Sequence, residues 1–87
     1  MSKPYEQFYN PDGTFTRIFD PSVSEDDLVW HRDYENREIK VLWNSGWKIQ
    51  FDNELPVSIN SVMRIPKMTY HRLIKGDGWL VLEIKEK

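Results

Sequence analysis

The feature that most constrains the fold is a series of short β-prone segments separated by turn residues. From residue 38 onward, segments of six to nine residues rich in branched and aromatic side chains alternate with clusters of Gly, Pro, Asn and Asp. In the segment WKIQFD, Trp47, Ile49 and Phe51 would share one face of a strand. Such segments recur about every ten residues, a spacing typical of an all-β sandwich or barrel. We expect strands at 14–19, 28–33, 38–43, 47–52, 57–65, 69–74 and 79–85.

The segment 20–36 admits two interpretations. Ser24, with Asp27 three residues later, could cap a helix that runs into LVWHRDYENRE. Apolar residues at helical spacing are scarce in that stretch, however, which favours a loop at 20–27 and a strand at 28–33. We therefore expect one domain, in which residues 1–27 form an N-terminal arm and a short strand and residues 28–87 form the barrel.

The length and the absence of cysteine limit how the chain can be stabilised. With 87 residues the core is small, and with no cysteine there is neither a disulfide nor a thiolate zinc site. Small domains of this kind often gain stability by oligomerising. We expect a homodimer, in which the aromatic arm YEQFY at 5–9 covers an edge strand of the neighbouring copy.

Charge and hydropathy argue against two classes of partner. The net charge is −2, with 12 basic and 14 acidic residues, whereas nucleic acids and anionic membranes attract a basic surplus. An oligonucleotide-binding barrel, with the aromatic residues of GWKIQFD stacking on bases, is therefore disfavoured. The chain has neither an apolar stretch long enough for a membrane helix nor an apolar signal core near its start. We expect a cytoplasmic protein.

The two histidines, His31 and His71, lie in separate expected strands. His31 and Asp33 project to the same side of a strand, and Glu38 begins the next strand, where its carboxylate could face the same pocket. If the last strands fold back onto these, His71 completes a set of two histidines and a carboxylate. Such sets suit Fe(II), Mn(II), Ni(II) or Zn(II) and leave positions open for water or substrate.

Each of these residues also has a purely structural interpretation. His71 could bond a backbone carbonyl, and His31 could pair with a nearby carboxylate on a solvated edge. Glu38 could form a surface ion pair of little energetic weight. Trp47 belongs either to the core or to the wall of a ligand pocket. Arg72 either binds a carboxylate or phosphate or pairs across the sheet.

The spacing of these residues resembles the two motifs of the cupin family. The first cupin motif reads His-x-His, three or four residues, Glu, about six residues and Gly. Here His31-x-Asp33 is followed by four residues, Glu38, seven residues and Gly46. Asp33 stands where the family has its second metal-binding histidine.

The second cupin motif reads Gly, five residues, Pro-x-Gly, two residues, His, three residues and Asn. Asn60, five residues, Pro66-x-Met68, two residues and His71 keep this spacing, and IPKMTYH looks like the family's entry to that strand. Asn60 and Met68 replace glycines, and Lys75 replaces the asparagine. The resemblance covers roughly residues 28–84.

The resemblance implies a cupin-like double-stranded β-helix, also described as a jelly roll or small β-barrel. It further implies a divalent metal held by His31, Glu38 and His71, with Asp33 as a supplementary ligand and a small polar molecule at the open positions. Arg72 and Trp47 are the expected ligand-binding residues. The alternative is a metal-free cupin-like binding or assembly module, which the presence of Asp33 favours. We find no separate nucleophile or base that would fix a reaction.

Overall fold

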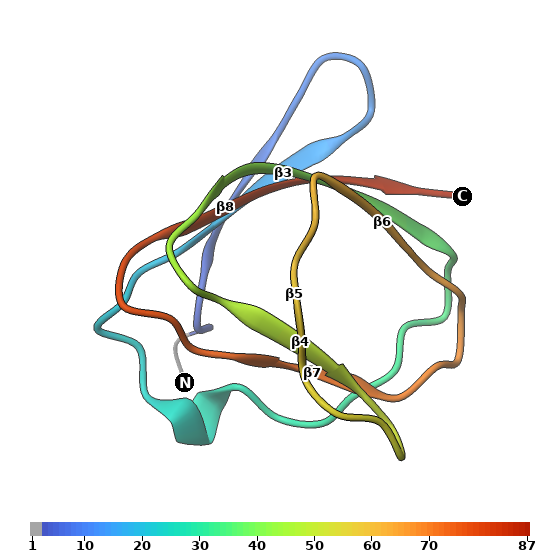
Figure 1. Cartoon of the computed structure of the whole chain (residues 1–87). Coiled ribbons are helices and arrows are strands. Elements are labelled where there is room, and N and C mark those ends of the chain that lie inside the picture. Colours follow the sequence, from blue (N-terminus) through green and yellow to red (C-terminus); the bar gives the residue numbers. More distant parts are fainter. Residues whose placement is uncertain (1–2) are drawn as a thin grey trace.

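The computed structural model describes residues 3–87 as two antiparallel sheets that enclose one apolar interior. The first sheet has the strand order β1-β2-β8-β3-β6, and the second has the order β5-β4-β7. Figure 1 shows the sheets nearly edge-on, with β3 and β8 in the upper layer and β4 and β7 in the lower one. The strands are β1 (Glu6–Tyr9), β2 (Phe15–Phe19), β3 (Arg37–Asn44), β4 (Lys48–Phe51), β5 (Val57–Ser58), β6 (Val62–Ile65), β7 (His71–Ile74) and β8 (Leu80–Glu86).

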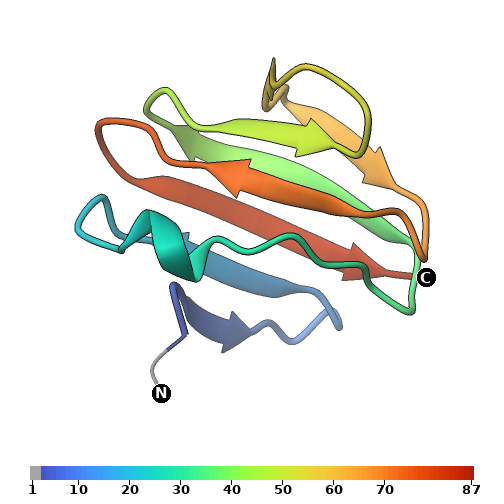
Figure 2. The ribbon, with the colours of Figure 1, turned by 90° about the horizontal axis from the view of Figure 1, so that it is seen from below.

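This architecture confirms the expected all-β double-stranded β-helix. Figure 2, turned by 90°, shows the strands of both layers running side by side, with the chain crossing between layers at the ends. Within the described part of segment 1–27, β1 pairs with β2, and all five residues of β2 pair with β8, so this segment takes part in the main sheet. No helix in residues 3–87 has the length and hydropathy needed to span a bilayer.

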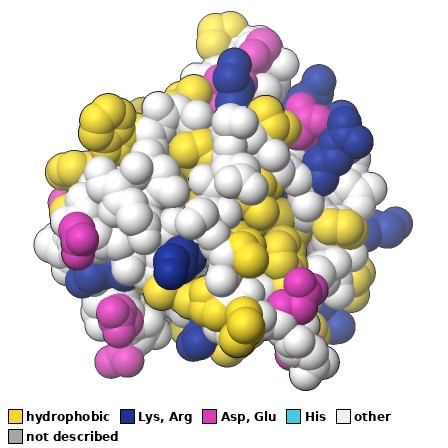
Figure 3. All heavy atoms as spheres, viewed as in Figure 1, with side chains coloured by type: hydrophobic (Ala, Val, Ile, Leu, Met, Phe, Trp, Pro, Cys, Tyr) yellow, Lys and Arg dark blue, Asp and Glu magenta, His cyan; other side chains and the backbone are white. Residues whose placement is uncertain are grey.

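The core follows from the alternation of side chains along the strands. In β8, Leu80, Leu82 and Ile84 are buried, whereas the residues between them face outward. Trp47 is fully buried, and its indole Nε1 donates a hydrogen bond to the carbonyl of Gly78 at 2.7 Å. The buried apolar set comprises Phe15, Phe19, Ile39, Trp47, Ile49, Ile59, Ile65, Leu80, Leu82 and Ile84. Viewed as in Figure 1, apolar side chains also reach the surface in the middle of that face, and charged ones lie mostly around its edge (Figure 3).

The segment 20–36 departs from the expected strand at 28–33. Ser24 does act as a cap, since its Oγ accepts a hydrogen bond from the Asp26 amide, but the helix is a single 3-10 turn over Glu25–Asp27 (η1). Beyond it, the chain forms only an isolated β-bridge at His31. The stretch lacks the alternating apolar residues that would anchor a longer strand on a sheet.

Met68 adopts a left-handed backbone conformation, with φ of 63°. It occupies the position of a glycine in the second cupin motif, where a residue without Cβ would meet this requirement without strain. Its amide donates a 2.7 Å hydrogen bond to the carbonyl of Asp33. The turn before β7 thereby holds the segment that carries Asp33 against the rest of the barrel.

Candidate metal centre

His31 and His71 face each other across a reciprocal backbone bridge. The His31 amide donates to the His71 carbonyl at 3.0 Å, and the His71 amide donates to the His31 carbonyl at 2.9 Å. Residues paired in this way place their side chains on the same side of the sheet. The imidazole centroids are accordingly 4.4 Å apart, and both rings line the same cavity. The expectation that the two histidines meet in one cavity is confirmed.

Asp33 joins the two rings because it lies two residues after His31. Its Oδ2 is 3.5 Å from His71 Nε2, and its Oδ1 is 3.9 Å from His31 Nε2. One ligand atom from each of the three residues can be chosen so that all lie within 4.8 Å of one another. His71 and Asp33 are largely buried, whereas the side chain of His31 is 43% exposed.

Both imidazoles present the same nitrogen to the carboxylate. Nδ1 of His31 is 3.0 Å from the Val29 carbonyl, and Nδ1 of His71 is 2.8 Å from the Thr69 carbonyl. A carbonyl can only accept a hydrogen bond, so each Nδ1 carries the proton. In the neutral ring, the lone pair is then on Nε2, directed at Asp33.

The surroundings of His71 favour the neutral form of its ring. Burial lowers the pKa of His71 below its ordinary value; the Thr69 hydrogen bond opposes that shift, and neighbouring His31 adds to it. At the same time, Asp33 Oδ2 is buried and has no hydrogen-bond partner among residues 3–87. Buried polar atoms are normally satisfied, so this unpaired carboxylate oxygen, 3.5 Å from Nε2 of His71, is an exception that calls for a partner.

Arg37, and not Glu38, points into the barrel from β3. Arg37 Nη1 lies 3.2 Å from Asp33 Oδ1, and its Nε and Nη2 donate to Glu86 Oε2 at 3.1 and 2.9 Å. Its alternation partner Ile39 is buried in the core. Asp33 is therefore bound to Arg37 through one oxygen, while the other remains free for a different partner.

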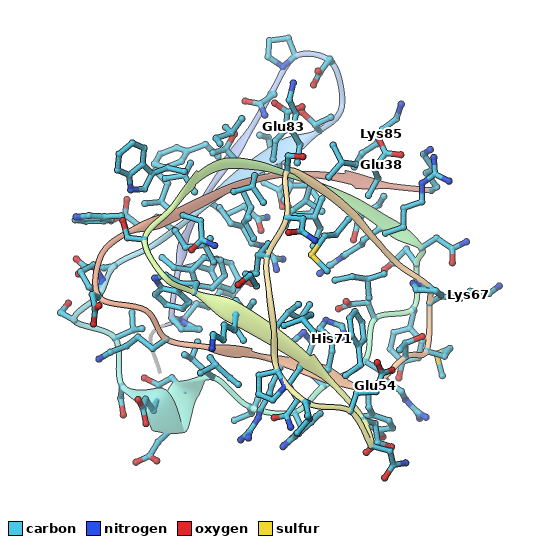
Figure 4. All side chains as sticks on the ribbon, in the orientation of Figure 1. Glu38, Glu54, Lys67, His71, Glu83 and Lys85 are labelled. Atoms are coloured by element: carbon cyan, nitrogen blue, oxygen red, sulfur yellow. The ribbon has the colours of Figure 1, made fainter. Side chains whose placement is uncertain are left out.

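Glu38 does not join the cluster, and its expected orientation toward the pocket is wrong. Its Oε2 lies 3.5 Å from Arg64 Nε and 3.4 Å from Lys87 Nζ on the outer face of the main sheet. Figure 4 shows it beside Lys85, on the opposite side of the sheet from His71. The lysine hydrogen bond is the largest cause that lowers the pKa of Glu38. Period-2 alternation explains the error, because burying Ile39 turns both of its neighbours outward.

The two expected ligand-binding residues also lie elsewhere. Trp47 fills the core without lining the main cavity. Arg72 donates from Nε to Gln50 Oε1 at 2.9 Å, and its guanidinium lies 4.8 Å from the centroid of the Trp30 ring. Arg72 thus pairs across the sheet, which was the structural alternative to ligand binding.

The main cavity lies between the two sheets and has a volume of about 420 Å³. Its apolar walls come from both sheets, and its polar members are Arg17, Asp27, His31, Asp33, Arg37 and His71. Sequence reasoning missed both arginines. The sequence pattern could have identified Arg17, because period-2 alternation places it on the same face of β2 as Phe15 and Phe19.

Comparison with solved structures identifies the architecture. A cupin domain from Bordetella pertussis Tohama I superposes with a TM-score of 0.65 at 15% identity, covering 100% of this chain and 98% of that one. A cupin-2 domain protein from Shewanella frigidimarina gives 0.66 at 14% identity, covering 100% and 85%. An RmlC-like cupin with a double-stranded β-helix fold from Methanocaldococcus jannaschii gives 0.66 at 9% identity, covering 95% and 77%.

No protein-family model matches the sequence, and a comparison with curated proteins gives no match. At these identities, the likeness establishes the fold alone. The agreement spans nearly the whole chain and includes a cupin domain of almost the same length. The chain therefore has the fold of a small, single-domain cupin.

Proposed function

We propose that this protein holds one divalent first-row transition metal ion through His31, Asp33 and His71, and binds a small polar molecule at the remaining coordination positions. The observation that carries the proposal is the buried, unpartnered Oδ2 of Asp33 facing the Nε2 of His71. Two imidazoles and a carboxylate form the mixed nitrogen and oxygen set that suits Fe, Mn, Ni or Zn better than Ca or Mg.

The spacing of the ligand atoms supports the proposal. In tetrahedral zinc sites, with bonds of about 2.0–2.1 Å, ligand atoms stand about 3.4 Å apart. The 3.5 Å between His71 Nε2 and Asp33 Oδ2 agrees with that value. His31 is the exposed member of the set, so its ring can adjust with little repacking.

The hydrogen bonds from both Nδ1 atoms to backbone carbonyls add a second argument. Ligating histidines usually donate their other ring N–H to a carbonyl or carboxylate, which fixes the tautomer and the ring orientation. Both rings already have this support. A bound metal would supply Lewis-acid or oxygen-activating chemistry.

A second candidate function is a metal-free binding module. The observation that favours it is the ion pair between Asp33 Oδ1 and Arg37 Nη1, which compensates the carboxylate charge without any metal. The two candidates differ in whether the protein gains stability from metal, because a ligand that binds only the folded state raises the melting temperature.

The test is elemental analysis of untagged protein, followed by melting curves in the presence of Zn²⁺, Ni²⁺, Mn²⁺ and, without oxygen, Fe²⁺. His31→Gln is the informative variant, because this exposed side chain can change without opening the core. Glu38→Gln is the matched control on the outer face. We expect at least one metal to raise the melting temperature of the wild type and the control alike, and to shift His31→Gln less. If no metal distinguishes the wild type from His31→Gln, the metal-free function is preferred.

A further inference from the structure

Arg17 interrupts the apolar inner face of β2. Phe15 and Phe19 are buried on either side of it, and its partner in β8 is the buried Leu82. Arg17 lines the cavity that also contains the histidine cluster. A cation placed among core residues opposes the local pattern, and such conflicts concentrate at functional sites.

The guanidinium of Arg17 contacts Gln7 and Tyr5, but no carboxylate of residues 3–87 forms an ion pair with it. Its Nε donates to Gln7 Oε1 at 2.6 Å, and its central carbon lies 4.1 Å from the centroid of the Tyr5 ring. Within residues 3–87, no carboxylate comes within ion-pair distance of Arg17, and neither Nη group has a hydrogen-bond acceptor in the protein. Burial is the largest effect on this group and lowers the pKa of Arg17, as expected for a cation partly removed from water.

Arg37, the other arginine of the cavity, differs in this respect. It contacts two carboxylates, Asp33 and Glu86, so its donors are already engaged. Asp27 also lines the cavity, but its side chain is exposed and makes no ion pair with Arg17. Among residues 3–87, Arg17 is therefore the cavity cation that no carboxylate contacts directly; Asp33 and Glu86 act on it only at longer range, and both of its Nη groups are free to bind a ligand.

We propose that the cavity binds a small organic carboxylate with an apolar body, whose carboxylate group is held by Arg17. A carboxylate matches the paired Nη donors of a guanidinium in a bidentate arrangement, and only the Nε of Arg17 is already engaged, by Gln7. A phosphate dianion would call for a second free cation, and Arg37 is engaged. The apolar walls, which include Leu73, Leu82 and Ile84, suit a hydrocarbon body.

This inference goes beyond the proposed metal function and does not depend on it. Arg17 is part of the cavity wall whether or not the histidines hold an ion. It also gives Tyr5 a role, because a cation–π contact with its ring helps to hold the guanidinium of Arg17 in place.

The test uses metal-free protein prepared with a chelating resin, since a soluble chelator such as EDTA is itself a carboxylate. The probes are benzoate and hexanoate, their neutral amides, and inorganic phosphate. Binding is followed by ¹H–¹⁵N NMR, including the Nε–H signal of Arg17. We expect the carboxylates to shift that signal and the amides to bind at least about tenfold more weakly, because the charge-assisted pair is lost.

Variants then assign the site. Arg17→Gln should weaken carboxylate binding about tenfold or more, while Arg64→Gln, a control at an exposed arginine of the outer face, should not change it. The wild-type comparison of acid with amide does not depend on how well Arg17→Gln folds. The proposal is overturned by equal binding of acid and amide, by tighter binding of phosphate than of either carboxylate, or by no carboxylate binding up to about 10 mM, weaker than about −3 kcal/mol.

Discussion

Replacing Asp33 by Asn tests whether Asp33 is a metal ligand or only the ion-pair partner of Arg37. The substitution keeps the shape of the side chain and removes its charge. Its amide oxygen can still accept a hydrogen bond from Arg37 Nη1, which lies 3.2 Å from Asp33 Oδ1 in the wild type. Its amide nitrogen then takes the place of Oδ2, 3.5 Å from the lone pair on His71 Nε2, and can donate to it.

The two effects on stability nearly cancel in the metal-free protein. The new donor relieves an unsatisfied buried oxygen and adds a hydrogen bond, a gain of about 1 kcal/mol. The ion pair with Arg37 becomes a hydrogen bond from the charged guanidinium to a neutral acceptor, a loss of about 1 kcal/mol, while Arg37 keeps Glu86 as its ion-pair partner. We therefore expect the free energy of unfolding to stay within about 1 kcal/mol of the wild type, far from the roughly 3–5 kcal/mol lost when a buried ion pair is broken.

The metal-loaded protein should behave differently. At a free metal concentration one hundred times the Kd, the wild type gains about 2.7 kcal/mol, or about 10–20 °C in melting temperature for a domain of this size. If the loss of the anionic ligand raises the Kd about one hundredfold, Asp33→Asn gains only about 0.4 kcal/mol at the same concentration. Urea titrations with and without metal measure both quantities, with Glu38→Gln as the control. A loss of about 3 kcal/mol or more without metal, or a metal gain equal to that of the wild type, would refute the reasoning.

Three further predictions concern other parts of the structure. Because burial lowers the pKa of His71, the unfolded chain takes up a proton before the folded protein does, so the metal-free protein should lose stability as the pH falls below about 6.5. Urea titrations should show a shallower loss for His71→Gln, and equal slopes would contradict this assignment. Met68→Gly should raise the free energy of unfolding by about 0.5–1 kcal/mol, since glycine adopts a φ of 63° without strain; a decrease in the same assay would count against it. We also predict a homodimer formed through the edge strand β1, where Phe8 is 52% exposed. Light scattering should show twice the 10.5 kDa mass for the wild type and a monomer for Phe8→Lys. A monomeric wild type would contradict this prediction.

The sequence predicted the fold and the meeting of the two histidines because both depend on regular spacing. The shared face predicted for Trp47, Ile49 and Phe51 is the one that faces the core, with Phe51 partly buried. The distance between the motifs placed His31 and His71 on facing segments, even though the strand expected around His31 is reduced to a single bridge. A bridge needs only one pair of residues in register, so the motif spacing correctly predicted the pairing of His31 with His71 although no strand forms around His31.

The carboxylate of the site was harder to choose because Glu38 and Ile39 compete for the same face of β3. Only one of two adjacent residues can face the interior, and burying Ile39 is favourable by roughly 2 kcal/mol, whereas burying an unpaired carboxylate is costly. The consistent inward set is Arg37, Ile39 and Val41. The motif comparison favoured Glu38 by its spacing, and the side-chain chemistry of the neighbouring position decided against it.

The role of Arg17 could not be read from the sequence for a different reason. The pattern Phe15, Arg17, Phe19 shows that the arginine faces inward, but whether it has an acid partner depends on residues far away in the chain. Arg37 finds Glu86 across the sheet, whereas Arg17 finds Gln7, a neutral side chain. Whether a carboxylate contacts an arginine directly is decided only by the three-dimensional arrangement.

The backbone bridge between His31 and His71 also links ligand exchange to amide hydrogen exchange. Each of the two amides donates to the carbonyl of the other residue, so neither can exchange with water until the segment around His31 lifts away from β7. The same opening separates the two imidazoles. A ligand held between the rings would therefore slow deuterium uptake at these two amides more than at the neighbouring ones in β7, and the uptake rate without ligand measures how often the site opens.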